Sequence, residues 1–141
     1  VDRAWFDEVL AKHKGQVVLV DYWATWCGPC RKKFPHTVVL AKDHQADGLA
    51  VIGVSMDDDD AHEDVVKFLT EQQATFDNLR SKTGASDESF EVFEVPGGTL
   101  PCLRLFDRGG KVIKTFAIDV DAEKQFTDED VAEAVRAALA K

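Results

Sequence analysis

The order of apolar and polar positions along the chain predicts alternating helices and strands. Residues 1–14 carry apolar side chains at helical spacing until Gly15 ends the pattern. The run QVVLVDYWA (16–24) is apolar, rich in valine and too short for a helix, so it predicts a buried strand. A helical pattern follows over 28–45, and LAVIGVSM (49–56) predicts a second buried strand. Strand, helix and strand in succession predict a parallel pair joined by a right-handed crossover.

The second half of the chain predicts two further helices, a hairpin and a closing helix. A helix is expected over 62–73, then a short extended piece and a short helix over 88–93. Two runs around DRGG within 102–116 predict a β-hairpin. Thr127, followed by acidic residues, predicts the N-cap of a helix that ends near residue 140. The expected fold class is α/β, with a mixed four-stranded sheet covered by helices on both faces, in one domain spanning residues 1–141.

Composition and charge narrow the class of protein. The chain has 141 residues, of which 45% are hydrophobic and 30% charged, as in ordinary soluble domains. A core of this size needs no disulfide to hold it together, so its three cysteines are available for chemistry. The net charge of −9 argues against nucleic acid and against an anionic membrane surface as partners. No stretch approaches the ~20 apolar residues of a membrane span.

Two of the three cysteines stand in the segment WCGPC, where the first predicted strand gives way to a helix. Cys27 follows the strand and is expected at the helix N-terminus, where free N–H groups favour a negative sulfur. Cys30 would lie one turn further on, placed to attack a mixed disulfide formed on Cys27. The spacing therefore predicts a nucleophile and a resolving thiol within one helical turn.

Metal binding and an inert structural dithiol are the alternatives for this cysteine pair. The tryptophan and the Gly-Pro pair around the cysteines have no structural rationale in an inert dithiol. A zinc clip would need two more ligands at short spacing, and Cys102 with four scattered histidines does not supply them. A soft metal such as Cu(I) could be bound by Cys27, Cys30 and Cys102, as in a copper chaperone. A peroxidase is less well supported because the chain has no Thr-x-x-Cys segment. The acidic run DDDDAHED (57–64) lacks the spacing of a calcium loop and is expected to be a solvated helix start.

The segment VDYWATWCGPCRKKFP resembles the active-site region of the thioredoxin superfamily. The likeness is greatest to exported thiol-disulfide oxidoreductases of the TlpA and ResA kind, and it extends over residues 15–116. The resemblance implies a thioredoxin fold, with Cys27 as the exposed nucleophile and Cys30 as the resolver. It implies no bound cofactor beyond the redox-active Cys27–Cys30 disulfide.

Asp21 is an unexpected carboxyl group on an apolar strand, on the same face as Val17 and Leu19. Burial should raise its pKa, unless it lies at the strand end and reaches water. The resemblance implies that Asp21 exchanges a proton with Cys30. Thioredoxins carry a lysine near this aspartate, but the matching position here is Gly53, so the ionic partner is expected to be missing. Lys33 stands where TlpA-like proteins usually have a glutamate.

The resemblance also implies a substrate groove beside the cysteines. It places Pro101 at the family's cis-proline, leaves the backbone of Leu100 free to pair with an extended peptide, and makes Trp26 a surface aromatic next to Cys27. The residues expected to bind substrate are Trp26, Gly28, Pro29, Leu100 and Pro101. Cys102, which directly follows this proline, is either a buried apolar side chain or a third redox or metal-binding thiol.

The function expected from these features is reduction or exchange of protein disulfides, with reduction favoured because Gly-Pro between the cysteines is the thioredoxin choice. Electrons would come from an upstream dithiol partner. The protein is expected to be a monomer. The chain begins at Val1 rather than Met, so it is expected to be a mature or trimmed form from which any signal peptide or anchor would be lost. The resemblance to exported oxidoreductases implies an extracytoplasmic location, with a signal or anchor removed. A cytoplasmic location is the alternative.

Overall fold

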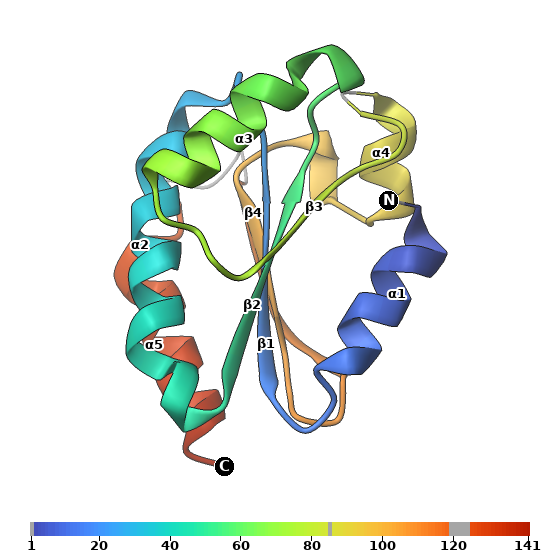
Figure 1. Ribbon diagram of the computed structural model, residues 1–141. Coiled ribbons are helices and arrows are strands. Elements are labelled where there is room, and N and C mark those ends of the chain that lie inside the picture. The colour runs from blue at the N-terminus through green and yellow to red at the C-terminus, as the bar shows by residue number, and fades with distance from the viewer. Residues whose placement is uncertain (1, 85, 119–124) are drawn as a thin grey trace.

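The centre of the molecule is a mixed sheet of five strands with helices on both faces (Figure 1). The computed structural model describes residues 2–84, 86–118 and 125–141. Along the sheet the strands lie in the order β3-β2-β1-β4-β5. The first three are parallel, and β4 and β5 each run antiparallel to the preceding neighbour. The strands are β1 (Val17–Trp23), β2 (Leu49–Ser55), β3 (Asp77–Arg80), β4 (Cys102–Phe106) and β5 (Val112–Ala117).

Helices α2, α3 and α5 cover one face of the sheet, and α1 and α4 cover the other (Figure 1). The bounds are α1 (Arg3–Lys12), α2 (Gly28–His44), α3 (His62–Glu71), α4 (Asp87–Val92) and α5 (Asp128–Leu139). Short 3₁₀ turns lie at Gln45–Asp47, Asp59–Ala61 and Pro96–Gly98. Thr127 caps α5 as expected, since its side chain accepts the N–H of Asp130 and the Asp130 carboxylate accepts that of Thr127.

The α/β class and the helices on both faces are confirmed, but the sheet has five strands rather than four. The fifth, β3, is the expected extended piece, which pairs in parallel with β2. Its four residues, Asp-Asn-Leu-Arg, are all half-buried. A strand this short and polar has neither a buried run nor a clear alternation, so the sequence did not predict that it joins the sheet.

Aromatic side chains fill the core on both sides of the sheet. On the α1 and α4 side, the Phe6 and Phe93 rings meet edge to face with centroids 5.4 Å apart, beside Tyr22. On the α2 and α3 side, Trp23 packs against Phe34, with centroids 5.0 Å apart. Successive β1 residues thus point to opposite faces, as strand geometry requires. This alternation decides which side each residue near the cysteines serves.

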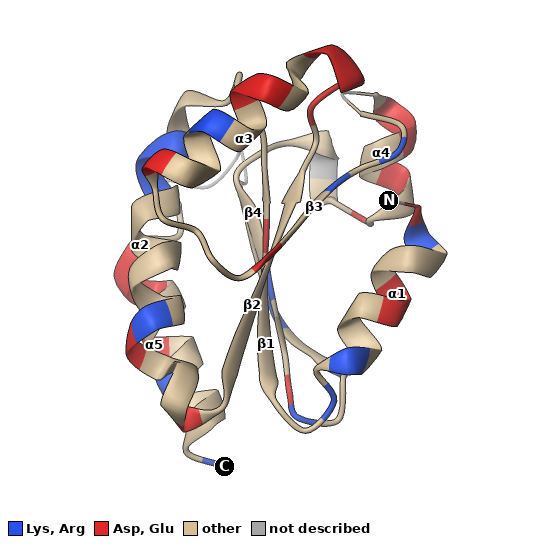
Figure 2. Ribbon diagram, viewed as in Figure 1, with Lys and Arg blue, Asp and Glu red and all other residues tan. Residues whose placement is uncertain are grey.

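Acidic residues gather around the starts of α3 and α4 (Figure 2). In the described part of the chain, none of the helices is both long and apolar enough to cross a bilayer.

Candidate active site

Cys27 and Cys30 lie at the junction between β1 and α2. Cys27 is the N-cap of α2, and its Sγ accepts the N–H of Cys30 at 3.3 Å. The N–H of Cys27 bonds the carbonyl of Ala24 at 3.1 Å, which closes the turn that leads out of β1. The two cysteines form a disulfide with Cα atoms 5.3 Å apart. The expected placement, a sulfur at a helix N-terminus with its partner one turn behind, is confirmed.

The surface around the disulfide is formed by the residues next to Cys27. Trp26 is 56% exposed, and Gly28 and Pro29 are also exposed. Cys27 itself is 6% exposed and Cys30 is 2% exposed. In this oxidised state the expected nucleophile is therefore less exposed than the resemblance implied, although Cys27 is the more exposed of the two residues.

Pro101 and Leu100 approach the same end of the sheet. The Leu100–Pro101 peptide bond is cis, as the resemblance implied. Cys102 pairs with Tyr22 in the antiparallel register of β4 and β1. Pro101 precedes Cys102, so it lies near the end of β1 from which the cysteine loop departs. Pro101 is buried and Leu100 is half-buried.

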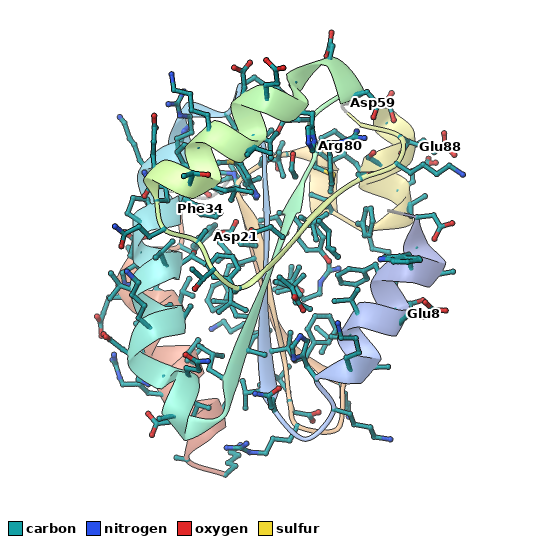
Figure 3. All side chains as sticks on the ribbon, in the orientation of Figure 1. Glu8, Asp21, Phe34, Asp59, Arg80 and Glu88 are labelled. Carbon is teal, nitrogen blue, oxygen red and sulfur yellow. A yellow bond between two sulfur atoms is a disulfide. The ribbon has the colours of Figure 1, made fainter. Side chains whose placement is uncertain are left out.

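Asp21 is buried between the sheet and α2, in the same region as Phe34 (Figure 3). The hydroxyl of Thr37 donates to its carboxylate at 2.9 Å. Burial raises the pKa of Asp21 from 3.8 to about 7, while the Thr37 hydrogen bond and the positive charge of Lys33 lower it. The alternative of a strand-end aspartate that reaches water is therefore wrong. A carboxyl group that titrates near neutral pH can both take up and release a proton.

The positive charge near Asp21 comes from α2 and not from the neighbouring strand β2. Gly53 does lie directly opposite Asp21 in the β1–β2 pairing. A Cβ atom at Gly53 would lie only 2.6 Å from Oδ1 of Asn78, so this space is already taken. The cation is Lys33, one turn beyond Cys30 on α2. The lysine is missing from β2, as expected, and the charge of Lys33 lowers the pKa of Asp21 only in part, so this carboxyl group still ionises well above its usual range.

Cys102 lies on the opposite face of the sheet from Asp21. It is fully buried and pairs with Tyr22, which packs against α1 and α4. Burial raises the pKa of its thiol to about 11, with Arg104 lowering it and Asp21 raising it. Among the described residues, no group of three or more His, Cys, Asp or Glu side chains is placed to hold a metal ion. The environment of Cys102 fits the first of its two alternatives, a buried apolar side chain.

Asp57 is a buried residue near the active site that the sequence analysis missed. It begins the acidic run that was expected to be solvated, and it is 0% exposed, whereas Asp58 to Asp60 are exposed. Its carboxylate accepts hydrogen bonds from Thr25 and from Ser55. The expectation of a solvated helix start is therefore wrong for Asp57. Four identical residues in a row gave no sign that the first is still buried beyond the end of β2.

The sequence pattern of the AhpC/TSA family matches residues 7–115, most of the chain. The chain belongs to the AhpC/TSA family. Sporulation thiol-disulfide oxidoreductase A of Bacillus subtilis (strain 168) is 24% identical over 126 residues, covering 87% of this chain and 73% of that protein. ResA, a thiol-disulfide oxidoreductase of Bacillus thuringiensis subsp. konkukian (strain 97-27), is 30% identical over 105 residues, covering 74% of this chain. The match covers 57% of ResA, so the chain spans little more than half of that relative.

A solved structure from Chlorobium tepidum, described as a candidate thiol:disulfide interchange protein DsbE, has the same fold. It superposes with a TM-score of 0.71 and 31% sequence identity, covering 92% of this chain and 84% of that one. The expected thioredoxin fold is thereby confirmed. The Cys27–Cys30 pair, the fold and the named relatives together identify this AhpC/TSA domain as a thiol-disulfide oxidoreductase.

Proposed function

We propose that this domain reduces disulfide bonds in protein partners, with Cys27 as the attacking group. The observation that carries the proposal is the position of Cys27 Sγ at the N-terminus of α2, where it accepts the Cys30 N–H. The helix dipole and the free N–H groups there stabilise a thiolate more than a thiol. Gly-Pro between the cysteines, as in thioredoxin, supports reduction as the direction.

The reaction consists of two exchanges that move two electrons in total. The Cys27 thiolate attacks one sulfur of a substrate disulfide, and the other substrate sulfur leaves as a thiolate. Cys30 then attacks Cys27 Sγ in the mixed disulfide and releases the second substrate thiolate. The substrate leaves as a dithiol, and the domain is left with the Cys27–Cys30 disulfide. A dithiol partner upstream returns two electrons to that disulfide.

Asp21 supplies the proton transfer that this second exchange needs. Cys30 is protonated while Cys27 carries the mixed disulfide, so its attack requires a base. A buried carboxylate with a pKa of about 7 fits this task, because it accepts a proton at neutral pH without being permanently protonated. Asp21 returns the proton when the Cys27–Cys30 disulfide is reduced again.

Protein substrates would dock beside Cys27, where Trp26, Gly28 and Pro29 are exposed and Leu100 is half-buried. We assign this surface to Trp26, Gly28, Pro29, Leu100 and Pro101. Trp26 supplies an exposed aromatic ring, and the Leu100 backbone supplies groups for pairing with an extended peptide. The resemblance to exported oxidoreductases supports action outside the cytoplasm. The proposed form of the protein is a monomer that binds no nucleic acid.

Insulin reduction driven by dithiothreitol tests this function directly. The wild-type domain is expected to accelerate insulin precipitation, and Cys27→Ser is expected to abolish the acceleration. Metal content after purification is measured on the same samples. Stoichiometric copper without turnover would instead support the soft-metal chaperone that uses Cys27, Cys30 and Cys102. Equilibration with glutathione buffers tests the direction of the reaction, since the reduction potential of thioredoxin is about −270 mV and that of the oxidant DsbA is about −120 mV.

A further inference from the structure

The carboxyl group of Asp57 is buried and surrounded by hydrogen-bond donors. Its two oxygens lie 3.1 Å from the backbone nitrogen of Thr25. The Thr25 hydroxyl donates to Oδ1 at 2.5 Å, and the Ser55 hydroxyl donates to Oδ2 at 2.5 Å. Removing a carboxyl group from water is costly, and three donors at these distances offset the cost.

The residue that Asp57 binds lies two positions before Cys27. Thr25 sits in the loop between β1 and α2, and Asp57 thereby connects this loop to the end of β2. A second connection lies beside it, since the N–H of Met56 bonds the carbonyl of Trp23 at 2.8 Å. The loop that carries the nucleophile is thus attached to the neighbouring strand on the side away from β4.

Asp57 is itself held in place by groups from β3. The guanidinium of Arg80 donates to the backbone carbonyl of Asp57 at 3.2 Å and forms an ion pair with Asp59. Figure 3 shows Arg80 and Asp59 together at one end of the sheet. Arg80 therefore holds the backbone of Asp57, while the carboxyl group of Asp57 holds Thr25.

We propose that Asp57 is a positioning residue for the redox reaction and acts through Thr25 on Cys27. By holding both the N–H and the hydroxyl of Thr25, it keeps the loop in the conformation that places Cys27 Sγ at the helix N-terminus. A looser loop lets this sulfur move off the helix axis, and the stabilisation of its thiolate decreases because the effect falls off within one turn. The proposal rests on the thiol chemistry of Cys27.

The test compares Thr25→Val, which removes the hydroxyl at similar size, with Thr25→Ser, which keeps it. The rate of iodoacetamide alkylation of Cys27 in the reduced protein is followed against pH, with the modified residue identified by mass spectrometry. Thr25→Val is expected to raise the apparent pKa of Cys27 by about half a unit and to slow alkylation at pH 7 about threefold. Thr25→Ser is expected to follow the wild-type profile.

Two further variants separate positioning from other effects. Ser89→Ala removes a buried hydroxyl that bonds Ser81 and Gly84 away from the cysteine loop, so it should cost stability without moving the pKa of Cys27. Asp57→Asn removes the charge of Asp57 while keeping its shape. If this variant lowers the pKa of Cys27 while Thr25→Val leaves it unchanged, Asp57 acts only as a nearby charge and the proposal fails.

The proposal is also overturned if Thr25→Val and Thr25→Ser shift the pKa equally, or if Thr25→Val loses stability with a wild-type pKa. A wild-type protein whose Cys27 titrates like free cysteine and which does not reduce insulin would contradict the proposed function itself. The two failures are therefore distinguished by the wild-type measurements alone.

Discussion

The hydroxyl of Thr37 donates a 2.9 Å hydrogen bond to the carboxylate of Asp21, and both side chains are buried. Thr37 lies two helical turns beyond Cys30 on α2, and Lys33 lies between them. One helix therefore carries the resolving sulfur and both groups that favour the ionised form of Asp21. The proton chemistry of Asp21 thus depends on α2 as much as on the strand that bears it.

Asp21 should make the stability of the oxidised protein depend on pH. Its pKa is about 7 in the folded protein and near 3.8 when exposed, so between these values the folded state binds a proton that the unfolded state has released. The free energy of unfolding should therefore fall as pH rises from about 4 to about 7, by up to roughly 4 kcal/mol. Asp21→Asn should remove this slope and be the more stable protein at pH 8. Urea denaturation at several pH values measures both.

An exposed carboxylate on the same helix provides the control. Asp43→Asn on α2 should keep the wild-type pH dependence. Parallel stability curves for wild type and Asp21→Asn between pH 4 and pH 8 would show that Asp21 does not titrate in this range.

Turnover of Asp21→Asn in insulin reduction should fall by about one to two orders of magnitude if Asp21 serves as the base.

The charge of Lys33 should lower the pH at which Asp21 ionises, against the larger effect of burial. Its charge lowers the pKa of Asp21, so Lys33→Gln should raise that pKa further, by roughly half a unit. The Lys33 ammonium also lies 3.3 Å from Asp128 and 4.8 Å from the Phe126 ring centroid, and losing these contacts should cost about 1 kcal/mol or less. Carbon-13 NMR of the Asp21 carboxyl group measures the pKa directly. Lys32→Gln, exposed next to it, should leave the titration unchanged, and equal effects of the two variants would rule out a specific role for Lys33.

Cys102 should be inert in the folded protein. It is 0% exposed, and its thiol pKa of about 11 leaves almost no thiolate at pH 7. Iodoacetamide should label Cys102 only after unfolding, and Cys102→Ala should keep insulin turnover within about twofold while losing roughly 1 kcal/mol of stability. Loss of turnover in Cys102→Ala, with the fold intact by circular dichroism, would make this thiol a third redox group.

The fold was predictable from the sequence wherever burial leaves a clear pattern. β1 and β2 are buried at every position, and the apolar runs indicated this directly. The cap at Thr127 and the placement of Cys27 follow from local chemistry that a few neighbouring residues decide. The short strand β3 was not predictable as part of the sheet, because its polar residues are half-buried and only its pairing with β2 makes it a strand.

Individual site residues were predictable from their own positions in the chain. Contacts between residues from distant segments were not. Cys27, Cys30 and the burial of Asp21 were expected from their positions in the chain. The link between Thr25 and Asp57 joins residues 32 positions apart, and the effect of Lys33 on Asp21 depends on how α2 packs on the sheet. Neither contact has a local signal, since both arise from tertiary packing.

Gly53 should not tolerate the lysine that thioredoxins carry near their buried aspartate. A Cβ atom there would lie 2.6 Å from Asn78 Oδ1 and 3.4 Å from Phe76 Cε1. Asn78 cannot easily yield, because its amide nitrogen donates to the carbonyls of Ala74 and Phe76 at 3.1 and 2.8 Å. Gly53→Ala and Gly53→Lys should therefore each lose about 1–3 kcal/mol of stability.

The clash itself is tested by a double-mutant cycle with Asn78→Ala, measured by urea denaturation. If Asn78 is the obstacle, Asn78→Ala should recover about 1 kcal/mol or more of the loss caused by Gly53→Ala, so that the two changes are not additive. Gly28→Ala is the stability control, since a Cβ at Gly28 meets no atom within 4 Å and should cost little. Additive losses at Gly53 and Asn78 would mean that Asn78 is not the obstacle. In that case, lack of space beside Gly53 would not explain why the positive charge near Asp21 comes from Lys33 on α2.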